Sequence, residues 1–278
     1  MSIADQALGR PGYGALPVVA LSRDGRAQTI EKLAAAECCL RVYSQARLLL
    51  KMICSPGCLG ELVLGYFYSE GLIASAEEIS CIRISQDGQR ADIFFREGGD
   101  REQALPQAEQ VLSAGGAVRL RPGCRREARP LSPLPHYEWQ PEQVFALADT
   151  FYQAKTHVYE QTGAAHSCFL SLGGAIRYSA EDIGRHNALD KVIGRALLDG
   201  GDLSQALAYT SGRVPVDMAA KAIRSRIPVL VSKSLPTVEA AALAKQYRLT
   251  LICLAKPQGL LVFADGAAIS PERKEAKP

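Results

Sequence analysis

The stretch from Glu181 to Lys191 gathers acidic, basic, imidazole and amide side chains around Gly184. It reads Glu-Asp-Ile-Gly-Arg-His-Asn-Ala-Leu-Asp-Lys, and the apolar residues that follow recur at the spacing of a helix with one buried face. We predict that Gly184 gives the chain a sharp turn and that Asn187 caps the helix. A helix start carries unpaired N–H groups and the positive end of the helix dipole, so the stretch predicts an anion site. The alternative is a surface helix whose charges satisfy one another.

Two further polar segments follow predicted strands in the C-terminal half. Ser211-Gly212-Arg213 comes after strand 207–210, and Ser232-Lys233-Ser234, closed by Pro236-Thr237, comes after strand 229–232. A hydroxyl, a glycine and a cation at a helix start supply what a phosphate or pyrophosphate needs. Neither segment is a Walker A or dinucleotide motif. Both nevertheless follow the carboxyl ends of strands in one predicted sheet, which is where ligands bind in α/β folds.

Cys124 is the third chemical candidate. It lies in Arg119-Leu-Arg-Pro-Gly-Cys-Arg-Arg-Glu-Ala-Arg129, where arginines flank the thiol on a segment rich in Gly and Pro. Nearby positive charge favours the thiolate, which is the nucleophilic form of cysteine. The segment therefore predicts either a reactive thiol on a mobile loop or a chance cysteine in a solvated basic linker.

Four other cysteines could form a metal site, but their spacing does not favour one. Cys38-Cys39 and Cys54-x-x-x-Cys58 could supply four soft ligands, but neither pair has the two-residue spacing of a zinc knuckle. Adjacent residues of a strand also point to opposite faces. We therefore predict no metal site and expect most cysteines to be small core residues, leaving open a thiol role for Cys54 and Cys58.

Composition describes an ordinary globular protein. The 278 residues are 47% hydrophobic and 22% charged, with a formal net charge of +3. The positive charge is concentrated in the segment around Cys124, which argues against general nucleic-acid binding. No apolar run is long enough to span a membrane, and the first residues lack the pattern of a signal peptide, so we expect a cytoplasmic protein without a disulfide framework.

Hydrophobic periodicity predicts an α/β protein in two parts. The first part is a smaller β-β-α-β-β domain, with a hairpin of 39–43 and 47–53, a helix over 59–69, and a hairpin of 79–84 and 91–95. The second alternates strands and helices after a hairpin of 165–172 and 175–179, which predicts a largely parallel sheet. The expected organisation is a loosely ordered arm (1–36), the smaller α+β domain (37–110), a mobile basic and Pro-rich loop and linker (111–141), the main α/β cofactor-binding domain (142–269) and a disordered tail (270–278).

The motif Glu181–Lys191 resembles the signature of the formate dehydrogenase accessory sulfurtransferase family (FdhD). Further stretches match that family in order, over roughly residues 37 to 265. They are Glu61–Ile73, Thr162–His166, Thr210–Arg213, Lys221-Ala222 and Ile227–Ser234. The resemblance implies a cytidine-deaminase-like C-terminal domain with a smaller appended domain, and a homodimer. A zinc deaminase itself is excluded, because His166-Ser-Cys168 has Cys where the catalytic Glu must be and the Pro-Cys-x-x-Cys motif is absent.

The resemblance also implies a function. Members of the family take persulfide sulfur from a cysteine desulfurase and deliver it to the bis-guanine-dinucleotide molybdenum cofactor, which formate dehydrogenase needs for activity. They carry a Cys-x-x-Cys pair on the loop, whereas this chain has only Cys124, with Arg121 and Glu127 three residues to either side. One sulfur suffices as nucleophile and carrier, but a loop disulfide cannot form. The alternative is a paralogue that binds the cofactor or a guanine nucleotide as a chaperone or regulator and transfers no sulfur.

We assign Cys124 as the catalytic residue of this sulfurtransferase-like accessory protein. The guanine-nucleotide pyrophosphate is expected to bind between the two polar loops and the start of the helix. The predicted cofactor-binding residues are His166, Asp182, Gly184, Arg185, His186, Asn187, Asp190, Lys191, Ser211, Gly212, Arg213, Ser232, Lys233, Ser234 and Thr237. The predicted hairpin places His166 and Asp182 near opposite ends of paired strands, with a satisfied core histidine as the alternative for His166.

Overall fold

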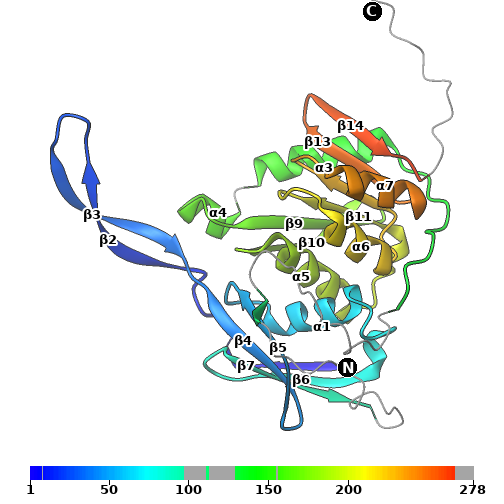
Figure 1. The fold of residues 1–278 in the computed structure, drawn as a ribbon, viewed down its shortest axis with the longest axis horizontal. Coiled ribbons are helices and arrows are strands. Elements are labelled where there is room, and N and C mark those ends of the chain that lie inside the picture. Colours follow the sequence, from blue (N-terminus) through cyan, green and yellow to red (C-terminus); the bar gives the residue numbers. More distant parts are fainter. Residues whose placement is uncertain (8, 97–110, 113–128, 155, 267–278) are drawn as a thin grey trace, which may run out of the picture.

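Two six-stranded sheets form the body of the protein, with helices α1 (Leu59–Ser69) and α5 (Arg185–Leu198) between them (Figure 1). The computed structural model describes residues 1–7, 9–96, 111–112, 129–154 and 156–266. The tail 270–278, Cys124 and most of the linker 111–141 lie outside the described residues. Among the described helices, none is long and apolar enough to cross a membrane.

The N-terminal sheet has the strand order β1-β6-β7-β4-β5-β8. Its strands are β1 (Ser2–Asp5), β4 (Cys38–Ser44), β5 (Arg47–Cys54), β6 (Ile79–Ile84), β7 (Arg90–Phe95) and β8 (Val111–Leu112). The predicted β-β-α-β-β order is confirmed for β4, β5, α1, β6 and β7, with the short 3-10 turn Ala76–Glu78 before β6. The apolar stripe of α1, which includes Leu62, Val63 and Phe67, is buried against this sheet.

The C-terminal sheet has the order β10-β9-β11-β12-β13-β14. Its strands are β9 (His166–Leu172), β10 (Ala175–Asp182), β11 (Ala206–Thr210), β12 (Val229–Ser232), β13 (Thr250–Lys256) and β14 (Gly259–Ala264), with the 3-10 turn Leu203–Gln205 before β11. The α/β class is confirmed. The expected parallel pairing holds for β11, β12 and β13. The sheet as a whole is mixed, because β9 lies antiparallel to β11 and each hairpin adds an antiparallel pair.

Helices cover both faces of the C-terminal sheet. Helices α5, α6 (Val216–Arg224) and α7 (Val238–Gln246) pack on one face, and α3 (Pro141–Gln153) packs on the other. Along β9, Cys168 and Leu170 join the core under α5, while Phe169 joins the core under α3. This alternation, expected for a strand with both faces buried, produces a three-layer domain. The short helix α4 (His157–Thr162) precedes β9 and was not predicted.

The two domains meet where α1 crosses α5. A Cβ atom added at Gly65 would lie 1.8 Å from the backbone oxygen of Asp190, and one added at Gly194 would lie 1.9 Å from the oxygen of Glu61. Both glycines therefore allow a backbone approach that any other residue would prevent. This close contact fixes the position of α5, and with it the motif 181–191, against the N-terminal domain.

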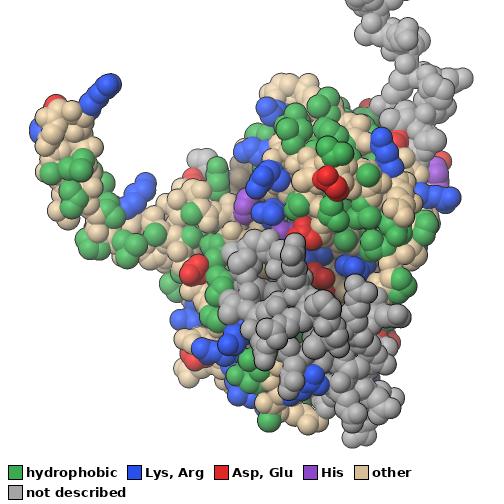
Figure 2. Space-filling model, in the orientation of Figure 1, with side chains coloured by type: hydrophobic (Ala, Val, Ile, Leu, Met, Phe, Trp, Pro, Cys, Tyr) green, Lys and Arg blue, Asp and Glu red, His purple; other side chains and the backbone are tan. Residues whose placement is uncertain are grey.

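Residues 1–36 are not the loose arm that the sequence predicted. Strand β1 pairs with β6 in the N-terminal sheet, and β2 (Tyr13–Leu21) and β3 (Ala27–Ala35) form a hairpin that projects from the body. Side chains of both hairpin faces are exposed, including apolar ones such as Leu21, which is 76% exposed (Figure 2). The strands were missed because a hairpin with neither face buried lacks the alternation of apolar and polar residues on which the prediction depends.

Candidate functional site

The candidate site lies at the edge of the C-terminal sheet where β11 and β12 end. Because these strands are parallel, the segments that follow them, beginning at Ser211 and Lys233, come to the same edge. Strand β9 runs antiparallel to β11, so its first residues return to that edge as well. The amide of Ser211 donates to the carbonyl of Ser167 at 3.0 Å, which ties the end of β11 to the start of β9. The predicted meeting of the two polar loops is therefore present.

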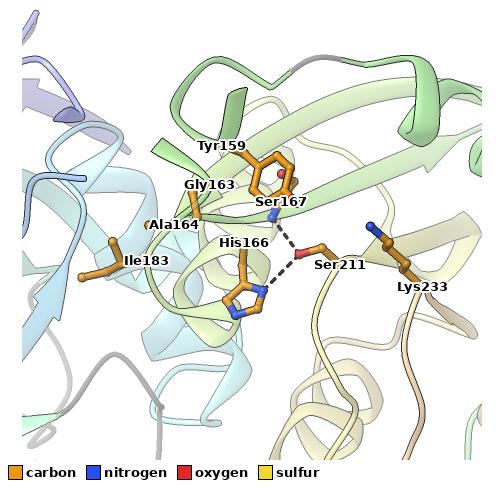
Figure 3. A pocket seen from close by; sticks show the side chains of 9 residues that line it. Tyr159, Gly163, Ala164, His166, Ser167, Ile183, Ser211 and Lys233 are labelled. Atoms are coloured by element: carbon orange, nitrogen blue, oxygen red, sulfur yellow. Dashed lines mark hydrogen bonds between the residues drawn. The ribbon is translucent and has the colours of Figure 1, made fainter. Parts of the chain in front are cut away.

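A cavity of about 380 Å³ opens at this edge (Figure 3). A volume of that size falls within the range of small-molecule sites. Its wall combines a hydroxyl, an imidazole, an ammonium group, an aromatic ring and exposed backbone. The lining residues are Tyr159, Gly163, Ala164, Ala165, His166, Ser167, Ile183, Ser211 and Lys233.

His166 and Ser211 form a hydrogen-bonded pair in the cavity wall. The amide of Ser167 donates to Ser211 Oγ at 3.1 Å, and His166 Nδ1 lies 3.1 Å from the same oxygen. Burial lowers the pKa of His166, and the positive charge of Arg185 lowers it further. His166 is therefore a neutral hydrogen-bonding group at pH 7, and of the two open predictions the structure favours the site residue over the core histidine.

Two further charged side chains stand at the site. Lys233 is exposed, lines the cavity, and lies with its Nζ 5.3 Å from the centre of the Tyr152 ring. Arg185 does not line the cavity itself; its side chain packs against Gly212, where an added Cβ would meet it at 2.8 Å. The Nε of Arg185 is buried and has no hydrogen-bond partner among the described residues. A cation with a free, buried donor is a group suited to an anionic ligand.

Other predicted residues of the two loops hold the loops in shape. Ser232 is buried, donates from its hydroxyl to the Gly212 carbonyl at 2.7 Å and accepts from the Ser234 amide at 2.9 Å. Thr237 caps α7 by accepting from the Ala240 amide at 3.2 Å. These contacts join the β11 and β12 loops to each other, whereas the Arg213 side chain is exposed and does not line the cavity.

The start of α5 differs from the predicted cap. Gly184 is the N-cap residue, with φ of −108°, which any residue can adopt, and Asn187 lies inside the helix. Asn187 Nδ2 donates to Asp182 Oδ1 at 2.9 Å and to the Ile53 carbonyl at 2.9 Å. Asp182 holds the turn before the helix, because its Oδ1 also accepts from the Gly184 amide at 2.9 Å. Asn187 thus joins the N-terminal domain to α5 rather than capping the helix.

Asp182 is the centre of a buried joint between the domains. Its Oδ2 lies 2.8 Å from Lys191 Nζ and accepts from the Ser55 amide at 3.0 Å. Burial alone would lower the pKa of Lys191, but the facing carboxylate raises it above the ordinary lysine value. As predicted, His166 begins β9 and Asp182 ends β10, and because these strands are antiparallel the two residues are direct partners in the register.

A second buried cluster contains Asp190. Lys221 Nζ lies 2.8 Å from Asp190 Oδ2 and 2.9 Å from Glu70 Oε1, and Ser69 donates to Asp190 Oδ1 at 2.6 Å. His186 is 1% exposed, with Nε2 3.0 Å from Asp217 Oδ2. Ser69 and Glu70 connect the Asp190–Lys221 pair to the N-terminal domain, whereas His186 contacts α6 within the C-terminal domain. Asp182, His186, Asn187, Asp190 and Lys191 are therefore close to the cavity in sequence but do not line it.

The cavity also contains residues that were not predicted as site residues. Tyr159 and Ile183 line it, together with the backbone of 163–165. The carboxylate of Glu181 accepts from the amides of Val158 and Tyr159 at 2.9 Å each, which fixes α4 and holds Tyr159 at the cavity. The stretch Thr162–His166 is one of those that match the family, and this match is the signal in the sequence that points to this part of the cavity wall.

Fold and cavity together define a two-domain α/β protein with a ligand site at the carboxyl edge of its main sheet. The FdhD/NarQ family model matches residues 35–270. The chain is 30% identical over 262 residues to the sulfur carrier protein FdhD of Xanthomonas euvesicatoria pv. vesicatoria (strain 85-10), covering 92% of each chain. It is 32% identical over 229 residues to that of Anaeromyxobacter dehalogenans (strain 2CP-C), covering 76% of this chain and 80% of the relative.

A solved structure agrees with these sequence matches. The crystal structure of a protein of Desulfotalea psychrophila, provisionally named a formate dehydrogenase accessory protein, superposes with a TM-score of 0.73 at 25% identity. The match covers 95% of this chain and 99% of that one. The chain belongs to the FdhD/NarQ family, and the resemblance read from the sequence is confirmed.

Proposed function

We propose that this chain is a sulfur carrier that serves formate dehydrogenase. It accepts persulfide sulfur from a cysteine desulfurase at Cys124 and delivers that sulfur to a guanine-dinucleotide molybdenum cofactor. The observation that carries the proposal is the family match over residues 35–270, together with relatives named sulfur carrier protein FdhD. In the loading step the Cys124 thiolate attacks the outer sulfur of the desulfurase persulfide, forms the new persulfide and releases the desulfurase thiolate.

The cavity fits one phosphate-bearing end of such a cofactor. Lys233 supplies positive charge in the cavity wall. Arg185, which packs against Gly212 and does not line the cavity, adds a cation whose buried Nε has no partner among the described residues. The polar wall of His166 and Ser211 lies beside them. A volume of about 380 Å³ is near the lower limit of small-molecule sites, so the cavity accommodates one nucleotide end and the remainder of the cofactor extends beyond it.

The residues proposed to bind the cofactor have distinct parts. Lys233 and Arg185 bind negative charge, and charge-assisted hydrogen bonds of this kind are the strong ones. The ring of Tyr159 offers a face on which a base can stack. Ser211, held by His166 and by the Ser167 amide, keeps the ends of β9 and β11 at a fixed distance. When bound, the cofactor supplies the molybdenum that receives the sulfur.

The remaining parts of the proposal concern context. We place the protein in the cytoplasm, where a cysteine with a free thiol stays reduced. A homodimer is also part of the proposal, on the strength of the family resemblance.

Reconstitution of formate dehydrogenase tests the function. Formate dehydrogenase produced in cells without their own sulfur carrier should regain activity when this chain, a cysteine desulfurase and cysteine are supplied. The Cys124→Ala variant should restore none. If the wild type binds guanosine diphosphate yet restores no activity, the alternative holds, and the chain is a cofactor-binding chaperone or regulator that transfers no sulfur.

A further inference from the structure

Cys38 and Cys54 form a close thiol pair in the N-terminal domain, apart from the cavity. Their Sγ atoms lie 3.5 Å apart, within hydrogen-bonding distance for sulfur. Cys38 is the first residue of β4 and is partly exposed, whereas Cys54 ends β5 and is 0% exposed. Neither thiol takes part in the function proposed above.

A bulge creates this pairing. Near the turn of the hairpin, Ser44 faces Arg47 and Tyr43 faces Leu48. Between Tyr43 and Val42 the register shifts by one residue, so that Val42 faces Leu50. The shifted register continues to the far end of the hairpin, where Cys38 faces Cys54. Each step back along β4 is matched by one step forward along β5 in a hairpin of uniform register. Continued from Ser44↔Arg47 without the bulge, that register would place Cys38 opposite Ile53.

The backbone allows a disulfide at this position. Directly opposed residues of an antiparallel pair have Cα atoms about 4.5 or 5.5 Å apart, depending on the hydrogen-bonding class of the pair. Both separations fall within the range of roughly 4.4–6.8 Å found for disulfides. The two sulfurs can therefore come from 3.5 Å to bonding distance by side-chain rotation, with little movement of the strands.

The surroundings give the two thiols different roles. The hydrogen bond from the Cys54 thiol lowers the pKa of Cys38, and the positive charge of Lys191 also lowers it. The same contact raises the pKa of Cys54, and burial adds to the effect. Cys38, which is also the accessible one, is thus the thiol that attacks, while Cys54 remains protonated behind it.

We infer that Cys38 and Cys54 are a redox-active dithiol that reacts with low-molecular-weight disulfides. In the first step the Cys38 thiolate attacks one sulfur of the small disulfide, forms a mixed disulfide and releases the first small thiolate. In the second step Cys54 attacks Cys38 Sγ, closes the protein disulfide and releases the second small thiol, which takes the Cys54 proton. The two protein thiols lose two electrons, and the small disulfide gains them.

The pair is connected to the cavity through a single residue. Ser55 follows Cys54, and its amide donates to Asp182 while its hydroxyl accepts from the Ile183 amide at 3.0 Å. Ile183 lines the cavity. Closure of the disulfide therefore takes place one residue from the joint that holds the cavity wall.

Mass spectrometry in glutathione redox buffers tests the inference. The folded full-length protein carrying Cys39→Ser and Cys58→Ser is equilibrated at rising ratios of oxidised to reduced glutathione. The samples are then quenched in acid, unfolded, alkylated and digested. Trypsin cleaves after Arg41 and Lys51, so Cys38 and Cys54 fall on different peptides, and fragmentation separates Cys54 from Cys81.

The expected result is a linked Cys38–Cys54 peptide that accumulates as the ratio rises and is lost again on reduction. The fully buried Cys168 and Cys253 should stay free throughout as internal controls. A Cys54→Ser variant should retain one glutathione on Cys38, and a Cys38→Ser variant should acquire none on Cys54. Full alkylation of both cysteines at the most oxidising ratio would overturn the inference. Because the first readout uses the native pair, it decides the matter even if a variant fails to fold.

Discussion

Replacing Lys191 by methionine should destabilise the joint between the two domains. The Asp182 carboxylate is 0% exposed and lies 2.8 Å from Lys191 Nζ. Methionine fills a similar volume but leaves the buried anion without its cation. Removing one partner of a buried pair typically costs about 3–5 kcal/mol.

The lower end of that range applies to this pair. Asp182 keeps hydrogen bonds from the Ser55 and Gly184 amides and from Asn187 Nδ2, and these donors still stabilise the charged carboxylate. We therefore expect Lys191→Met to reduce the free energy of unfolding by about 3 kcal/mol, a large part of the roughly 5–15 kcal/mol of a typical domain.

Urea unfolding at pH 7 measures the effect through the midpoint and the slope. Adding Asp182→Asn to Lys191→Met should recover part of the loss, since the buried charge is then gone, and the double-mutant cycle should give a coupling of about 2 kcal/mol. Lys245→Met, on the exposed face of α7, is the matched control and should change stability by less than about 0.5 kcal/mol. A Lys191→Met variant whose free energy of unfolding lies within about 1 kcal/mol of the wild-type value would show that the buried pair does not stabilise the joint.

Three further predictions concern packing, binding and pH. Gly65→Ala should lower the free energy of unfolding by about 3 kcal/mol or more, because its Cβ would lie 1.8 Å from a backbone oxygen of α5. Gly259→Ala is the control and should change the free energy of unfolding little, because an added Cβ meets no atom within 4 Å. Equal urea midpoints for the two variants would contradict this prediction. Lys233→Ala should weaken binding of guanosine diphosphate about tenfold in calorimetric titration, and Lys245→Ala should not; equal affinities would remove Lys233 from the site. Burial lowers the pKa of His166 in the folded protein, so the unfolded chain binds the proton more readily. The neutral ring therefore contributes its full stability above about pH 6.5, and that contribution is lost as the pH falls below this value. His166→Asn should flatten that part of the urea-midpoint profile between about pH 5 and 6.5, and an unchanged slope would show that other groups cause it.

Much of the fold follows from local pattern. The hairpin of β4 and β5, the helix α1 and the alternation from β11 to β13 were all predicted near their observed bounds, because each has one or two buried faces. The hairpin of β2 and β3 has no buried face and was missed. The one-residue shift between Val42 and Tyr43 was also missed, and it decides that Cys38 meets Cys54.

The candidate site was predicted in part. The loops that begin at Ser211 and Lys233 meet as the parallel order of β11 and β12 requires, and His166 joins them. The motif 181–191 could not be interpreted in the same way, because partners distant in sequence determine what its side chains do. Ser55 engages Asp182, and Ser69 engages Asp190, so charges that suggested an anion site form buried bridges between domains.

Intact-mass measurement shows directly whether Cys124 carries sulfur. The wild type and Cys124→Ala would be incubated with a cysteine desulfurase and cysteine, and each mass recorded before and after reduction. The wild type should gain one sulfur that is lost on reduction, and the variant should gain none. No gain on the wild type, or an equal gain on the variant, would contradict this role of Cys124.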